Sequence, residues 1–210
     1  MVTSGRQCGW TRKACRADSL ANTMDAFSYL SVLLSIIFGL SITQILKGFR
    51  GLMLARLRIH IYWPCVAWAI LLLVIDVQAW WAMYELRLHM HWTFLAFSMV
   101  LAQTIPLYLL AGLIFPDIRV DADTNLRTHY FDNHRCFFSL AAALCGISVS
   151  KVLVLFHEWP PLFDLGFQCL FAVTSLIAAW TTNEWYHKAL APAASVSLVV
   201  YIGLLFANLR

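Results

Sequence analysis

Charged side chains are scarce in this sequence. Only 12% of the 210 residues are Asp, Glu, Lys or Arg, whereas 61% are hydrophobic, and the mean hydropathy is +0.72. A soluble globular domain is usually about a quarter charged and less than about half apolar. A water-soluble fold of this size cannot cover so much apolar surface. The composition therefore excludes an ordinary soluble domain and indicates a chain whose outer surface is solvated by lipid.

Motifs for nucleotide, nucleophilic or redox chemistry are also missing. There is no Walker, Rossmann or GxSxG pattern. The six cysteines show no CxxC spacing, and we expect them to be free and to pack as small apolar residues. The net charge of +4 comes from residues in short links, which is a topology signal and not a nucleic-acid footprint. We therefore expect no cofactor, no catalytic residues and no nucleic-acid partner, and we favour a protein that is not an enzyme.

Six apolar runs are each long enough to cross a bilayer, which takes about 20 helical residues. The runs are continuously apolar and do not alternate with period two, which disfavours strands. We expect an all-α, polytopic membrane protein with six transmembrane helices, multi-pass in a cell membrane, with the lipid bilayer as its partner. The expected spans cover residues 25–46, 61–84, 92–115, 135–156, 162–181 and 189–208.

Basic residues gather in the links that follow the first, third and fifth spans. Cytoplasmic links carry the excess of Lys and Arg, so these three links should face the cytoplasm and both termini the outside. The basic residues of segment 1–24 conflict with this orientation. Because Met24 directly precedes an apolar run, we interpret residues 1–24 as a disordered basic tail that lies upstream of a true start at Met24. Residues 25–210 then form one transmembrane domain. The basic link residues are Lys47, Arg50, Arg56, Arg58, Arg119, Arg127, Arg135 and Lys188.

Two similar octapeptides suggest that the chain is a duplicated half. "GLSITQIL" covers Gly39–Leu46, and "GISVSKVL" covers Gly146–Leu153. Each is followed by a Trp-Pro pair that opens a span, and each of those spans ends in Trp-x-x-x-Glu. Because each half has an odd number of spans, the second copy must enter the membrane inverted. We predict a 3+3 inverted repeat with halves at about 25–116 and 134–210, the alternative being chance similarity between apolar sequences.

Small residues recur at every fourth position in both octapeptide regions. Such stripes let helix backbones approach closely in lipid. We therefore expect the first and fourth spans to pack near the centre of the bundle, the alternative being hydroxyl groups that line a polar path. The stripe residues are Ser35, Gly39, Thr43, Ala142, Gly146 and Ser150.

Four polar side chains within the spans form the candidate transport or gating path. Ionisable groups inside a membrane are expensive and are functional candidates by default. Asp76 and Lys151 lie at about the same depth, which permits an ion pair. Asp76 is either a proton- or cation-coupling carboxylate or a structural group, held by a salt bridge or bonded to serine or indole groups such as Trp80. Gln103 lies near the middle of the third span, where Pro106 can kink the helix and free a carbonyl group. Gln44 completes the path.

The segment "HYFDNHR" contains the candidate metal ligands His129, Asp132 and His134. Imidazole and carboxylate groups bind divalent metals, and a metal site beside the membrane would suit an enzyme that acts on lipids. The spacing matches no strong motif such as HExxH. A solvated loop is the alternative.

Three stretches of the sequence have a familiar pattern: "FSYLSVLLSIIFGL", "YWP…W" and "HYFxNxR". In these stretches the chain resembles small, uncharacterised multi-span membrane proteins of bacteria. The resemblance implies a location in the bacterial inner membrane and assigns no role to any residue.

Our leading hypothesis is a small transporter or channel for an ion or small solute. One alternative is a non-catalytic sensor or an accessory subunit of a larger complex, and another is a metal-dependent membrane lipid enzyme. We also expect that the bundle can assemble as a homo-oligomer.

Overall fold

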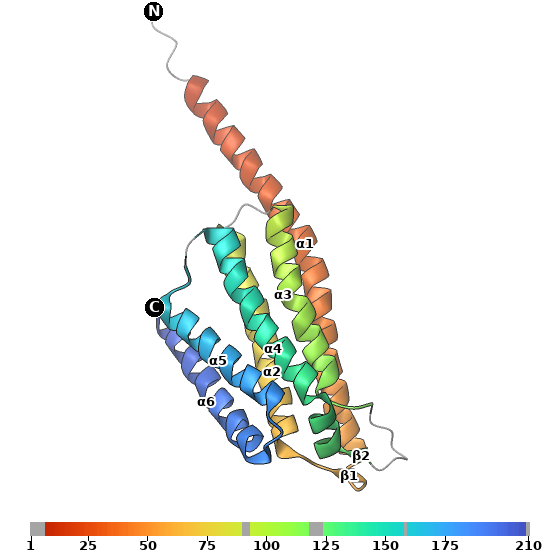
Figure 1. Ribbon diagram of the computed structural model, residues 1–210. Coiled ribbons are helices and arrows are strands. Elements are labelled where there is room, and N and C mark those ends of the chain that lie inside the picture. The colour runs from red at the N-terminus through yellow and green to blue at the C-terminus, as the bar shows by residue number, and fades with distance from the viewer. Residues whose placement is uncertain (1–6, 90–92, 118–123, 158, 209–210) are drawn as a thin grey trace, which may run out of the picture.

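The computed structural model describes the backbone of residues 7–89, 93–117, 124–157 and 159–208, and the side chains of residues 31–83, 93–117, 124–157 and 159–204. This part of the chain is all-helical apart from one pair of very short strands (Figure 1). The elements are α1 (Gln7–Leu54), β1 (Ile59–His60), α2 (Trp63–His89), α3 (Phe94–Leu113), β2 (Thr124–Asn125), α4 (Leu126–Phe156), α5 (Leu162–Trp180) and α6 (Glu184–Asn208).

Six helices are long and apolar enough to cross a membrane. This finding confirms the all-helical prediction and is compatible with a multi-pass membrane protein. Large apolar side chains lie exposed on the outer faces of the bundle, as expected where lipid and not water surrounds the helices. Examples from five helices are Ile36, Val77, Leu109, Leu176 and Val199.

α4 and α1 extend furthest beyond their expected spans. α4 begins at Leu126, before the expected span, because the Asn125 side chain accepts hydrogen bonds from the backbone N–H groups of Arg127 and Thr128. α1 begins at Gln7, so the tail that we expected to be disordered is helical from that residue and extends beyond the other helices (Figure 1). Once a helix exists, adding residues to its end needs no new nucleus. A start at Met24 stays a prediction.

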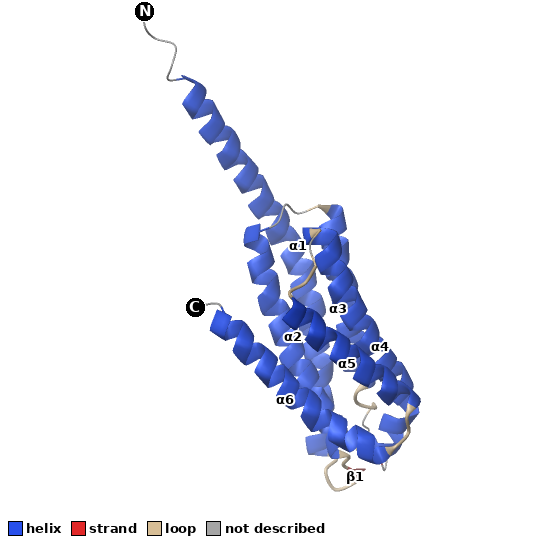
Figure 2. Cartoon of the chain, turned by 60° about the vertical axis from the view of Figure 1, so that its left-hand side comes forward, coloured by secondary structure: helices blue, strands red, loops and turns tan. Residues whose placement is uncertain are grey.

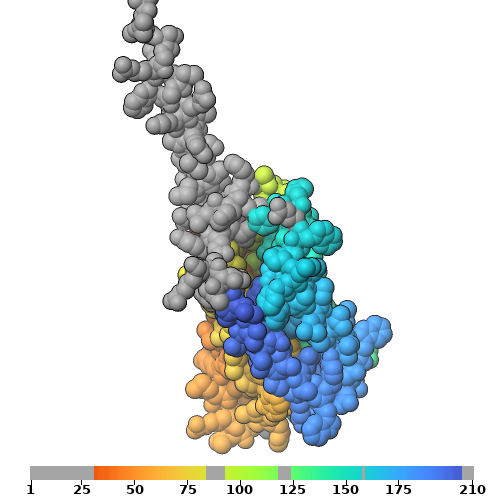
Figure 3. Space-filling model, turned by 90° about the vertical axis from the view of Figure 1, so that its left-hand side faces the viewer, coloured from red at the N-terminus to blue at the C-terminus, as the bar shows by residue number. Residues whose placement is uncertain are grey.

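The helices pack as a bundle with an inclined pair on one flank. α1 lies along α3, α3 along α4, and α4 along α5. α5 and α6 are inclined to α1 and α3 in both ribbon views (Figures 1 and 2). In the space-filling view of this flank, α6 in dark blue lies beside the orange and yellow surface of the first two helices (Figure 3). A large core cluster takes side chains from all six helices, and a smaller one joins α1, α2 and α3.

The three links predicted to be cytoplasmic gather at one end of the bundle (Figure 1). β1 and β2 pair in parallel, with Ile59 opposite Thr124, and so join the link after α1 to the link after α3. Arg127, at the start of α4, forms a 3.0 Å ion pair with Glu184, at the start of α6. The up-and-down course of the chain thus agrees with the distribution of basic residues, and the orientation in a membrane stays a prediction.

The small-residue stripes do not lie at the centre of the bundle, contrary to our expectation. A Cβ atom added at Gly39 or Gly146 would meet nothing within 4 Å. Thr43 and Ser150 are exposed and donate their hydroxyl hydrogens to the carbonyl groups one turn earlier on their own helices. The stripe lies outside because the opposite face of α1 fills the core with larger groups, among them Phe38.

The two halves of the chain also pack differently. α1 lies along α3, but the corresponding helices of the second half, α4 and α6, do not pack along each other in the described residues. The inverted repeat is therefore not shown by this arrangement.

Candidate functional site

Asp76 is the most deeply placed ionisable candidate, and it joins three helices. Its side chain on α2 is 1% exposed. The Ser41 hydroxyl on α1 donates to Asp76 Oδ2 at 2.7 Å and lies 3.4 Å from the carbonyl oxygen of Leu107 on α3. The second carboxyl oxygen, Oδ1, is buried and has no hydrogen-bond partner within the described part of the chain. A bond to a serine is among the structural alternatives for Asp76 and is present here, while a coupling role for this carboxyl group stays a prediction.

Lys151 does not meet Asp76 and contacts a different group. Its ammonium Nζ donates to Gln103 Oε1 at 2.7 Å, which joins α4 to α3. Asp76 and Lys151 form no ion pair with each other in the described part of the chain, where Glu184 pairs with Arg127 and with Lys188. The physical reason is the order of the helices: α3 packs against both α1 and α4, so Gln103 on α3 is the group that Lys151 meets.

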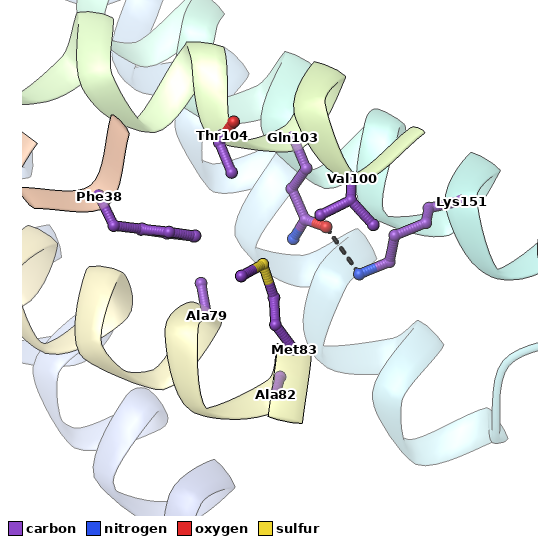
Figure 4. Close-up of a pocket in the computed structure, with 8 residues that line it drawn as sticks. All are labelled: Phe38, Ala79, Ala82, Met83, Val100, Gln103, Thr104 and Lys151. Carbon is purple, nitrogen blue, oxygen red and sulfur yellow. Dashed lines mark hydrogen bonds between the residues drawn. The ribbon is translucent and has the colours of Figure 1, made fainter. Parts of the chain in front are cut away.

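A cavity of about 30 Å³ lies beside the Lys151–Gln103 pair (Figure 4). Its walls come from α1, α2, α3 and α4, and apart from Lys151, Gln103 and Thr104 they are apolar. The cavity is one helical turn from Asp76, since three helices contribute one residue to its wall and another, three positions away, to the Asp76 contact. These residue pairs are Phe38 and Ser41 on α1, Ala79 and Asp76 on α2, and Thr104 and Leu107 on α3.

A second, larger cavity of about 370 Å³ lies between α1 and α3 at the end where the links gather. Gln44 lines this cavity, three residues beyond Ser41, so it does not meet Lys151. Leu107 and Leu110, each 1% exposed, lie along α3 between the two cavities. Asp76 and Ser41 therefore lie between the larger cavity, which Gln44 lines, and the smaller cavity, which Lys151 and Gln103 line.

The three candidate metal ligands lie on one helix but do not converge. His129 Nε2 lies 3.0 Å from the carbonyl oxygen of Leu113, and Asp132 is exposed. His134 is buried, and its Nδ1 donates to the carbonyl of Phe131. At about 100° per residue, positions 132 and 134 lie on opposite sides of α4. Within the described residues no three His, Cys, Asp or Glu side chains are placed to hold a metal.

A buried hydrogen bond between α4 and α6 was not found by sequence reasoning. His187 is fully buried; its Nε2 lies 2.9 Å from the carbonyl oxygen of Thr181, and its Nδ1 lies 3.0 Å from the Tyr130 hydroxyl. A carbonyl oxygen only accepts, so Nε2 carries the proton and Nδ1 accepts from Tyr130. The His134 ring packs edge-on against His187, with centroids 5.8 Å apart. No local sequence signal could have found this contact, because its partners are far apart in the chain.

The fold and this site together define the class as an α-helical bundle with six candidate membrane-spanning helices. A row of polar side chains, called the polar seam below, runs through α1, α2, α3 and α4 and consists of Ser41, Asp76, Gln103 and Lys151. The chain matches no protein-family model, no curated protein and no solved structure.

Proposed function

We propose that the protein is a small transporter or channel for an ion or small solute, located in the bacterial inner membrane. The observation that carries the proposal is the buried Asp76 carboxyl group, with one oxygen unpartnered in the described structure, between two cavities. Burying such a group in an apolar span is destabilising, and intramembrane carboxyl groups commonly serve ion or proton pathways.

The four candidate path residues take separate positions along this route. Lys151 and Gln103 line the smaller cavity, and Gln44 lines the larger one. Asp76 and Ser41 lie in the barrier between the two cavities. The barrier is closed in this conformation because Leu107 and Leu110 fill it. Transport would require α1 and α3 to separate at Ser41. Protonation of Asp76 would weaken the hydrogen bond that this carboxylate accepts from Ser41 and so permit the separation.

The 3+3 inverted repeat belongs to this proposal as a prediction. Two related halves that rock against each other give alternating access in many transporters. Support for it comes from the octapeptides around Gly39 and Gly146 and from the landmarks that follow them in the same order. The two halves pack differently in this structure. That difference is compatible with one conformation of a transporter in which only one of the two halves closes the path.

The test is flux through purified protein reconstituted in liposomes. Currents on a solid-supported membrane would be recorded under gradients of H⁺, Na⁺, K⁺ and Cl⁻, and radiolabelled small solutes would be added as a panel. We expect flux for at least one of these, and a loss of about tenfold or more in Asp76→Asn, because an amide cannot exchange the proton.

Asp132→Asn is the matched control. It makes the same chemical change at an exposed aspartate outside the seam, and we expect it to keep the wild-type flux. Folded, correctly inserted protein that passes nothing under any gradient would overturn the proposal. Equal loss of flux in both variants would remove Asp76 from the path.

A further inference from the structure

We propose that the cavity beside Lys151 binds a small monovalent anion of halide size. The inference names the substrate class of the transport path and therefore rests on the proposed function. The observation that carries it is a charge imbalance: among the described side chains, one ammonium group and no carboxylate line the cavity.

The hydrogen-bond donors at this cavity exceed the acceptors that the protein offers them. Lys151 Nζ has three N–H groups, and Gln103 Oε1 accepts one of them at 2.7 Å. An ammonium group only donates, so the Gln103 side chain must turn its oxygen toward Lys151, which leaves its NH₂ group as a further donor. Figure 4 shows the Lys151 and Gln103 side chains directed toward each other across the gap between α3 and α4. The Thr104 hydroxyl already donates to the carbonyl of Leu101 at 2.9 Å.

A negative charge is the missing part of this arrangement. Lys151 is half-buried, and an ammonium group that has lost part of its hydration is destabilising unless it is paired. The neutral amide of Gln103 compensates only part of that loss. Among the side chains that the structure describes, Lys151 forms no ion pair. Phe38, Met83 and Val100 form apolar walls, so an anion here would be held in a low-dielectric site, where its attraction to the ammonium is strong.

The volume of the cavity limits the size of the anion. A water molecule needs about 10–15 Å³ of such space, so the cavity of about 30 Å³ admits roughly two or three groups of that size. A chloride or bromide ion is slightly larger than water and fits. Phosphate and carboxylic-acid metabolites are too large.

The experiment is direct binding of halide to the purified, detergent-solubilised full chain with gluconate as the bulk anion. Equilibrium dialysis with radioactive chloride would give the affinity, and thermal unfolding with added chloride or bromide at constant ionic strength would give a second readout. We expect one saturable site per chain and roughly ten- to hundredfold weaker binding in Lys151→Met, the effect of losing a hydrogen bond to a charged group.

Three further variants keep the inference falsifiable. Lys188→Met removes a half-exposed lysine at the far end of the bundle and should leave binding unchanged. Lys151→Arg keeps the charge, so binding should persist in it even if Lys151→Met fails to fold. Glu85→Gln tests whether a carboxylate of α2 is the counterion instead, since α2 contains this residue but its side chain is outside the described set.

Absence of saturable halide binding would overturn the inference, as would unchanged binding in folded Lys151→Met. Halide binding that is tighter in Glu85→Gln than in the wild type would also overturn it, because that result identifies a protein carboxylate as the partner of Lys151. Binding without any flux in liposomes would refute the proposed function and keep the anion site. Flux of a cation without halide binding would refute the anion site and keep the proposed function.

Discussion

Tyr62 illustrates, at the scale of a single residue, a buried polar group whose hydrogen-bonding capacity is unused. It is 5% exposed, packs against the ring of Tyr130, and its hydroxyl has no partner among the described residues. Burial raises the pKa of Tyr62 to about 12, and the nearby Glu184 carboxylate adds to the effect. The folded protein therefore favours the neutral phenol.

We predict that Tyr62 makes the protein less stable at alkaline pH. Its folded pKa is raised, so its contribution to stability is fully present below the unfolded value of 10.0 and is lost as pH rises through about 12. Tyr62→Phe should remove this part of the alkaline loss, and at neutral pH it should change stability by at most about 1 kcal/mol, toward greater stability. Thermal unfolding of both proteins across this pH range measures it. Parallel alkaline curves would contradict the prediction.

The residues of the polar seam could be predicted individually but not in their pairings. Asp76, Lys151 and Gln103 were visible because polar groups are conspicuous in apolar runs. Their partners depend on which helix lies between which others, and that order is set by tertiary packing. Ser41 was therefore missed as the partner of Asp76, although a serine was among the partners that we considered.

At the scale of helices, Gly48 of α1 lies directly against Phe115, which follows the end of α3. A Cβ atom added at Gly48 would clash with Cδ2 of Phe115, a buried ring that flanks the larger cavity. No such contact exists at Gly39 on the same helix, where an added Cβ would meet nothing within 4 Å. The two glycines therefore form a matched pair.

We predict that Gly48→Ala destabilises the protein by about 1–3 kcal/mol, because α1 and α3 must separate or the Phe115 ring must move. Gly39→Ala should be neutral or stabilising by up to about 1 kcal/mol, since alanine is the better helix former. Thermal unfolding in detergent followed by circular dichroism compares them. Equal destabilisation by the two substitutions would show that the α1–α3 contact is elsewhere.

The two glycines of the small-residue stripes show where element-level prediction fails. The spacing of Gly39 and Gly146 predicted close helix packing, but both glycines are exposed, and a Cβ atom added at either would meet nothing within 4 Å. The apolar runs predicted all six helices, since hydropathy depends only on composition. The start of α4 could not be found in the same way, because a single side chain, Asn125, sets it.

For the molecule as a whole, a hydrogen bond and an ion pair connect α4 to α6 near the end where the links gather, beside the ring contacts of His187. One is the buried Tyr130–His187 hydrogen bond, and the other is the exposed Arg127–Glu184 ion pair. They join the inclined flank of α5 and α6 to the rest of the bundle (Figure 1). Their burial differs strongly, so their contributions to the attachment of the flank should differ too.

We predict that Tyr130→Phe loosens the flank more than Arg127→Gln does. Removing the hydroxyl leaves the Nδ1 of the fully buried His187 without its donor, which costs about 1–3 kcal/mol. The Arg127 side chain is 57% exposed, and an exposed ion pair contributes only about 0–1 kcal/mol and less at high salt. Hydrogen exchange of the α6 amides should therefore accelerate in Tyr130→Phe at any ionic strength, and in Arg127→Gln only slightly and at low salt. The reverse order would mean that surface charge, and not the buried hydrogen bond, holds α6 in place.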